Sequence, residues 1–185
     1  MRDGHDENQE LSEEPLNSEF LKNMIVEVSG SLQTLVGPED SHGFLSVTGA
    51  NVARWLNEEH LQIDRDVVLD VRDVAEATAQ LENAIGADFY VVSISEEEIV
   101  FANRRCPFGK KVNGRQSLCA MTSQIIGKTM AENLGYARVT LHEALAKGDP
   151  SCRVVVALKP SENASEPTHE TMEYFPLGPR NLAAE

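Results

Sequence analysis

The 185-residue chain has few of the features that define several common protein classes. It contains three cysteines and no Cys-x-x-Cys pair, which disfavours zinc ribbons, thioredoxin-type redox motifs and the short ferredoxin pattern. It has no apolar run near the roughly 18 residues of a membrane span and no basic-then-apolar signal segment. Three cysteines without a signal segment are typical of a reducing cytosol, so we expect a cytoplasmic protein with no membrane partner.

Positive charge is also scarce, because the formal net charge is -14. Residues 1–20 carry seven acidic residues against one arginine, and residues 161–185 carry five against one. Both ends are polar and poor in large apolar side chains, which predicts disordered acidic tails over 1–17 and 161–185. A chain this acidic is a poor candidate for binding a phosphate backbone, so we expect no autonomous nucleic-acid binding.

The remaining residues suit one domain, and its first part has helical periodicity. Apolar residues recur at helical spacing in three segments, 18–36, 44–56 and 73–85. Gly37-Pro38 predicts a stop after the first of them. We therefore predict a helical region over 18–87 that serves as core or as a dimerisation surface.

The pattern changes to β-forming residues at about residue 88, in the region 88–160 of the same domain. The predicted elements are two hairpin strands, a helix, and two further strands, at 88–95, 99–103, 117–135, 136–142 and 152–159. The fold class is therefore α+β. N-terminal helices are followed by a largely antiparallel sheet with one helix inserted, in the order β-β-α-β-β.

All three cysteines lie at the ends of these predicted elements, where side chains from distant segments converge. Their spacing is Cys106-x12-Cys119-x32-Cys152. Three thiolates with one open position fit a 4Fe-4S cluster, or a metal whose fourth ligand comes from elsewhere. Asp149 and His142 are the nearest chain candidates for that ligand, and solvent, a small thiol or a partner are alternatives. Separate, purely structural cysteines are the other interpretation.

A basic segment surrounds two of the cysteines in this acidic chain. Its five cations are Arg104, Arg105, Lys110, Lys111 and Arg115. Nearby cations and the N-terminus of a helix lower the pKa of a thiol, so we expect Cys106 and Cys119 to have thiolate character. The same cations would offset the negative charge of thiolates gathered on a metal or cluster.

Three stretches carry a resemblance to a known family. They are "CPFG" (106–109), "SLCAMTSQIIGKTMAENLGYARVTLHEALAKGD" (117–149) and "SCRVVVAL" (151–158). Together they resemble the methanogen output domain, a small cysteine-bearing module of signalling and regulatory proteins in archaea and bacteria. The same order of cysteine-containing motifs is similar to the sensor halves of iron–sulfur-responsive, DeoR-like transcription repressors and, more distantly, to 4-vinyl reductase domains. Those repressors carry a winged helix-turn-helix ahead of the sensor half, whereas this chain begins with an acidic segment and an amphipathic helix.

The resemblance implies a cytosolic sensory or regulatory module that binds a 4Fe-4S cluster through Cys106, Cys119 and Cys152. In this interpretation Asp149 is a candidate fourth ligand, and the module signals redox or oxygen state to a protein partner. The partner can be a second copy, giving a homodimer through the N-terminal helices. We assign no catalytic residue and expect no enzyme. The alternatives are a small-molecule sensor with cysteines lining its pocket, a structural zinc site, a thiol redox switch, and a cysteine-dependent or cluster enzyme.

Overall fold

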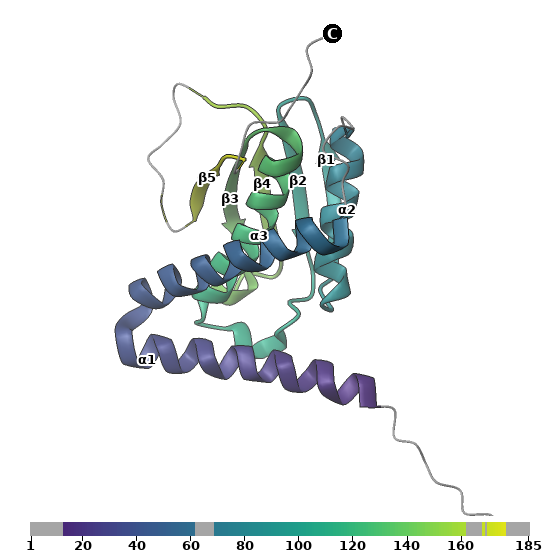
Figure 1. Ribbon diagram of the computed structural model, residues 1–185. Coiled ribbons are helices and arrows are strands. Elements are labelled where there is room, and N and C mark those ends of the chain that lie inside the picture. Colours follow the sequence, from purple (N-terminus) through teal and green to yellow (C-terminus); the bar gives the residue numbers. More distant parts are fainter. Residues whose placement is uncertain (1–12, 62–68, 162–167, 169, 177–185) are drawn as a thin grey trace, which may run out of the picture.

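The computed structural model of the chain describes residues 13–61, 69–161, 168 and 170–176. Three helices and five strands make up the fold (Figure 1). The helices are α1 (Glu13–Leu56), α2 (Val71–Ala84) and α3 (Gln116–Leu134), and the strands are β1 (Phe89–Ile94), β2 (Glu98–Asn103), β3 (Ala137–Glu143), β4 (Cys152–Ala157) and β5 (Thr171–Tyr174). Short helical turns occur at η1 (Asn57–Leu61), η2 (Gly109–Val112) and η3 (Leu145–Lys147). The predicted α+β class is confirmed.

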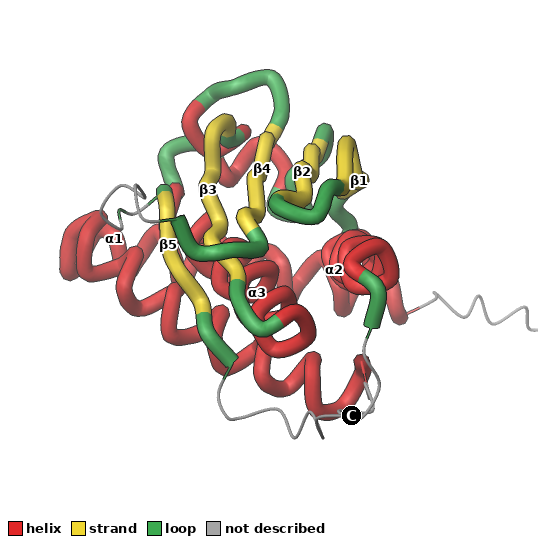
Figure 2. Tube along the Cα trace, turned by 90° about the horizontal axis from the view of Figure 1, so that it is seen from above, coloured by secondary structure: helices red, strands yellow, loops and turns green. Residues whose placement is uncertain are grey.

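The five strands form one antiparallel sheet in the order β1-β2-β4-β3-β5. β4 therefore lies between β2 and β3, although it follows both in the chain. This order brings the start of β4 beside the end of β2, and Figure 2 shows the strands in that sequence. Cysteine-bearing segments that are far apart along the chain are neighbours for this reason.

Helix α1 consists of two helical segments, the first leg before Gly37 and the second leg after it, because the helical conformation is interrupted at Gly37. Gly37 has φ 88° and ψ 167°, a left-handed φ that glycine adopts without the cost of a Cβ. Pro38 then stands in the first turn of the second leg, where a missing N–H costs little. The predicted stop at Gly37-Pro38 is thus a sharp turn between two helical legs, and the second leg crosses α3 (Figure 1).

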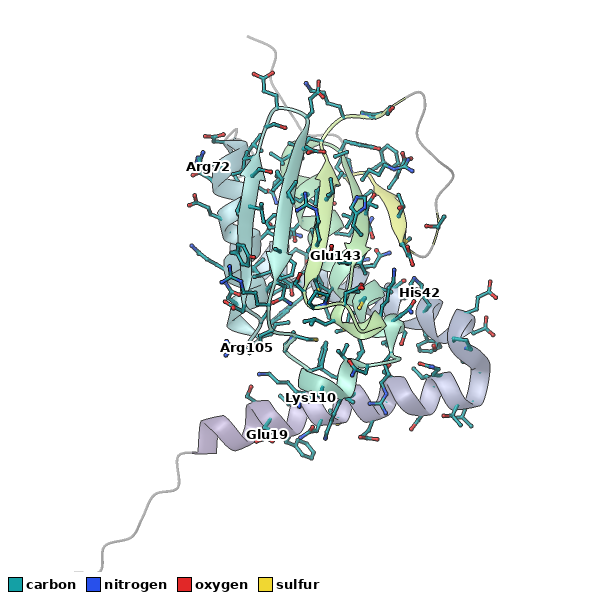
Figure 3. All side chains as sticks on the ribbon, turned by 180° about the vertical axis from the view of Figure 1, so that it is seen from behind. Glu19, His42, Arg72, Arg105, Lys110 and Glu143 are labelled. Carbon is teal, nitrogen blue, oxygen red and sulfur yellow. The ribbon has the colours of Figure 1, made fainter. Side chains whose placement is uncertain are left out.

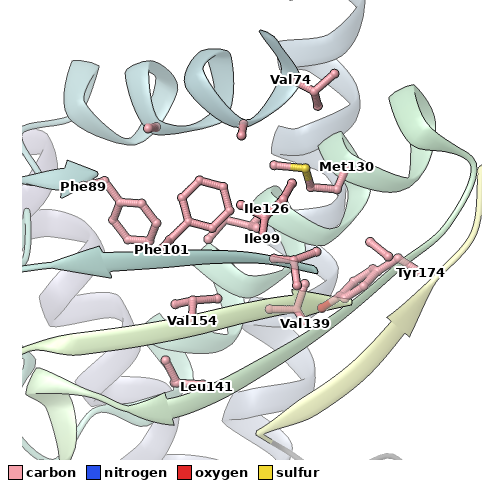
Figure 4. Packing of buried hydrophobic residues seen from close by; sticks show 14 of the residues in the cluster. Val74, Phe89, Ile99, Phe101, Ile126, Met130, Val139, Leu141, Val154 and Tyr174 are labelled. Atoms are coloured by element: carbon pink, nitrogen blue, oxygen red, sulfur yellow. The ribbon is translucent and has the colours of Figure 1, made fainter. Parts of the chain in front are cut away.

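Helix α3 lies between the sheet and α1 and is buried along most of its length. The core between the sheet and helices α2 and α3 is apolar (Figure 4). Alternate residues of β2 and β4, including Phe101 and Val154, point into it, as the two-residue period of a strand requires. Residues such as Ile126 and Met130 on α3 face them.

Two glycines mark where other groups approach a helix closely. A Cβ on Gly49 of α1 would lie 2.5 Å from the carbonyl oxygen of Met121, so the two helix backbones are in close contact there. A Cβ on Gly127 of α3 would overlap the aromatic ring of Tyr174 on β5. β5 therefore packs closely against α3 at Gly127, where the helix carries no side chain.

The predicted tails need correction. Residues 171–174 form β5, so the prediction of disorder over 161–185 is wrong for this segment. Thr, Met and Tyr suit a strand, and the edge of β3 supplies a partner that a composition argument does not see. α1 begins at Glu13, within the predicted tail 1–17, and residues 1–12, 162–167, 169 and 177–185 lie outside the described residues.

No helix among the described residues is both long enough and apolar enough to cross a membrane.

Candidate functional site

The three cysteines line one small, mostly apolar cavity of about 40 Å³. Cys106 follows β2, Cys119 lies in the first turn of α3, and Cys152 opens β4, so three separate segments contribute. The apolar wall is made by Phe89, Phe108, Leu118, Ile126, Leu141 and Val154. The structure thus brings the predicted cysteine positions together. Within the described residues, no three His, Cys, Asp or Glu side chains stand at the spacing of a single metal ion.

The β2–β4 pairing explains how Cys152 reaches the segment that carries Cys106. Cys152 is the register partner of Asn103, the last residue of β2. The buried Asn103 side chain accepts hydrogen bonds through Oδ1 from the backbone N–H groups of Asp88 (3.0 Å) and Arg105 (3.1 Å). These bonds hold the turn after β2 in place and so position Cys106 beside the start of β4.

A second turn positions Cys152 from the other side. Asp149 Oδ2 accepts a hydrogen bond of 2.7 Å from the N–H of Ala144, which closes the turn that contains η3. The N–H of Leu145 in this turn donates to Cys152 Sγ at 3.4 Å. The Asp149 side chain therefore stabilises this turn, and it does not line the cavity. His142 is exposed on β3.

Helix α3 carries Cys119 in its first turn. The residue that caps this helix is Arg115, which makes no side-chain capping bond. Ser117 is buried inside the helix, and its hydroxyl is hydrogen-bonded to the buried Ser29 hydroxyl of α1 at 3.0 Å. This contact joins the first turn of α3 to the first leg of α1.

Burial dominates the electrostatics of the thiols. The pKa of Cys106 is raised to about 11 and that of Cys119 to about 12, mainly by burial and in smaller part by the neighbouring Cys152. The pKa of Cys152 is also raised, first by burial, and is opposed by the N–H of Leu145. Our expectation of thiolates without a bound metal is wrong, because removal from water outweighs any dipole or charge effect.

The five cations of the basic segment do not line this cavity. Arg104 stacks over the ring of Tyr90, with its guanidinium carbon 4.6 Å from the ring centroid. Lys111 donates to Asn23 on α1 (2.8 Å), and Arg115 donates to the Lys111 carbonyl (3.1 Å). Figure 3 shows Lys110 on the segment between the sheet and the first leg of α1. Lys147 of η3 is the cation that lowers the pKa of Cys119.

The raised thiol pKa values predict slow alkylation of the metal-free, folded protein. With a pKa of about 11, Cys106 is mostly the unreactive thiol at pH 7, and its thiolate fraction should increase about tenfold per unit up to about pH 10. We expect labelling by iodoacetamide at pH 7 to be at least about 100-fold slower than in urea-unfolded protein, measured by mass spectrometry. Rapid labelling of the folded protein at pH 7 would contradict these pKa values.

A carboxyl side chain that was not among the predicted site residues also lines the cavity. Glu82, in the last turn of α2, is 2 % exposed, and burial raises its pKa to about 8. Its Oε1 has no hydrogen-bond partner among the described residues. The signal in the sequence was a carboxylate on the helix face shared with Ala75, Thr78 and Ala79, which are all buried. A helical wheel of 71–84 identifies it as the single charged residue of that face.

A match to a known family over most of the chain shows which family the protein belongs to. Residues 19–157 match the family described as Methanogen output domain 1. The chain belongs to this family. The match covers α1 through β4, with all three cysteines, and confirms the resemblance seen in the sequence. No curated protein sequence matches the chain.

Two solved structures share the fold of this methanogen output domain at low sequence identity. One is a trafficking protein particle complex subunit 3 from Naegleria fowleri, covalently bound to palmitic acid. Its TM-score is 0.56 at 17% identity, covering 79% of this chain and 97% of that one. The other is the phenol-responsive sensory domain of the transcription activator PoxR with phenol. Its TM-score is 0.52 at 16% identity, covering 76% of this chain and 73% of that one.

Proposed function

We propose that this methanogen output domain is a sensory or regulatory module that binds an iron–sulfur cluster, most simply a 4Fe-4S cluster, through Cys106, Cys119 and Cys152. The observation that carries the proposal is the convergence of three half-buried thiols, from three separate segments, on one cavity. Family membership and the fold shared with a sensory domain support the sensory part.

The donor set fits a cluster better than it fits one zinc ion. A structural zinc holds four ligands close around one ion, and the described side chains do not stand at that spacing. Ligands of a cluster bind different irons and lie farther apart. A bound cluster would supply a centre sensitive to oxygen and redox state, while the three cysteines hold it and the apolar wall limits access of water. The cysteines perform no catalysis in this proposal.

A small-molecule sensor is the second candidate, favoured by the apolar lining of the cavity. The similar solved structures hold palmitic acid and phenol. However, pockets for organic ligands of ordinary size are about 300–1,000 Å³, and the cavity here is about 40 Å³. An organic ligand of that size would therefore need a larger cavity than the structure has.

The test of the proposal is iron and acid-labile sulfide analysis of the wild-type protein, purified without oxygen and reconstituted with iron and sulfide. We expect about four irons per chain and a broad visible absorption band that disappears in air. Protein that contains no iron or sulfide after reconstitution would refute the proposal. Stoichiometric zinc in a colourless protein would favour the structural zinc site instead.

We further propose that the module forms a homodimer through α1, by which a change at the cysteines reaches a partner. The first leg exposes large apolar side chains at helical spacing, Phe20 (63%), Met24 (46%) and Val28 (49%) among them. Exposed apolar stripes of this kind mark protein interfaces. The net negative charge of the chain disfavours binding to nucleic acid, so we propose no nucleic-acid partner.

The dimer predicts a specific effect of one charge on α1. Val28→Glu should convert the protein from dimer to monomer, because the carboxylate would be buried without a partner in the interface. Light scattering after size-exclusion chromatography measures this. The matched control is Val92→Glu on β1, since Val92 is equally exposed at 48%. A wild-type protein that remains monomeric at high concentration would contradict the dimer.

A further inference from the structure

Glu82 is a buried carboxylate with no evident structural role. It lies in the last turn of α2 and is 2 % exposed, and its Oε1 accepts no hydrogen bond from any described residue. Burying a carboxyl group without a partner costs free energy, and buried charged groups are normally paired or bound to metals. The residues beside it on the same helix face are Ala75, Thr78 and Ala79, and the Thr78 hydroxyl donates to the Val74 carbonyl.

The same side chain faces the thiols. Glu82 lines the cavity together with Cys106, Cys119 and Cys152, and its charge contributes to the raised pKa of Cys106. Four side chains with metal-binding atoms therefore meet from four elements: α2, the loop after β2, α3 and β4. Among the described residues that line this cavity, Glu82 is the one carboxylate.

Two other polar side chains that line the cavity have hydrogen-bond partners. Asn103 Oδ1 accepts two backbone hydrogen bonds, and the Thr122 hydroxyl donates to the Leu118 carbonyl of its own helix at 3.5 Å. Asp149, the candidate from the sequence, uses Oδ2 to close the turn at Ala144. An acceptor oxygen that is buried, without a partner and beside three thiols distinguishes Glu82 from all of these.

We propose that the Glu82 carboxylate is the fourth protein ligand of the metal centre held by the three cysteines. This rests on the proposed function. When a preformed cluster binds, the three thiols and the carboxyl group would each release a proton to solvent and replace a ligand that the irons held before, so this ligand exchange changes no oxidation state. A carboxylate oxygen is a harder ligand than a thiolate and holds iron of this type less tightly. The iron at Glu82 is therefore the one that exchanges with solvent or an added thiol.

The experiment compares iron content in the wild type and in Glu82→Gln, both reconstituted without oxygen. The amide keeps the shape of the side chain but is a poor iron ligand. We expect the wild type to hold about four irons and Glu82→Gln to hold about three, with a changed electron paramagnetic resonance signal. Glu76→Gln is the matched control, because Glu76 lies on the exposed face of α2 with its side chain 56% exposed. It should match the wild type.

A second variant covers the case in which Glu82→Gln does not fold. Glu82→Cys offers a fourth thiolate, and it should keep about four irons and lose them to a chelator at least about tenfold more slowly than the wild type. Wild-type iron content and chelation rate in both variants would overturn the Glu82 proposal and leave the cluster proposal standing. A wild type that takes up no iron would overturn both.

Discussion

Replacing Cys119 by serine should lower the iron bound per chain by about tenfold or more. Cys119 lies on α3, the most buried helix of the fold, and burial raises the pKa of its thiol to about 12. Metal binding must supply the free energy to deprotonate it, and the bond to iron does so. A serine hydroxyl is far harder to deprotonate in the same surroundings and cannot replace that bond. Iron and sulfide analysis of the anaerobically reconstituted variant measures the effect.

The control for this experiment is a variant of Ser123, which lines the same cavity. Ser123 is one turn further along α3 and carries no metal-binding sulfur, so Ser123→Ala should retain the wild-type iron content. Cys106→Ser and Cys152→Ser should behave as Cys119→Ser does. If Cys119→Ser keeps the full iron content while the wild type is loaded, Cys119 is not a ligand, and the three-cysteine site is wrong.

The second large effect concerns stability. Gly127→Ala should lower the free energy of unfolding by about 1–3 kcal/mol, the usual cost of overpacking a core. The added Cβ would overlap the ring of Tyr174, which is 3% exposed and held between α3 and the sheet. Alanine favours a helix over glycine by about 1 kcal/mol, so propensity alone predicts the opposite sign. Urea unfolding followed by circular dichroism decides between the two.

Two further variants isolate the cause. In the Tyr174→Ala background the ring is absent, so Gly127→Ala should no longer destabilise and should gain up to about 1 kcal/mol. Gly43→Ala is the control, because Gly43 lies on the exposed side of α1 with nothing within 4 Å of its added Cβ. It should stabilise the protein slightly. A Gly127→Ala variant that is as stable as the wild type would contradict the packing seen here.

Local patterns in the sequence determined the main elements. Helical periodicity marked both legs of α1, and β-forming runs marked β1 to β4, because side-chain periods of 3.6 and 2 follow directly from backbone geometry. The positions of the cysteines at element ends also determined that they could converge. These features depend on neighbours along the chain, and no long-range contact is needed to see them.

Tertiary structure decided what the local pattern could not. The strand β5 forms because β3 offers it an edge, and Gly127 is needed because that strand carries Tyr174 over α3. The cysteine spacing along the chain did not reveal that burial raises the thiol pKa values, since burial depends on which segments cover the site.

The basic segment and Glu82 show most clearly which features follow from the sequence and which from the tertiary structure. The sequence by itself determined that cations cluster near Cys106, but it did not identify Glu82 as a site residue. Only the folded chain directs Arg104 and Lys111 away from the thiols and turns Glu82 toward them. Distance along the chain sets which residues can meet, whereas the direction of each side chain and its removal from water are set by the packing of elements far apart in sequence.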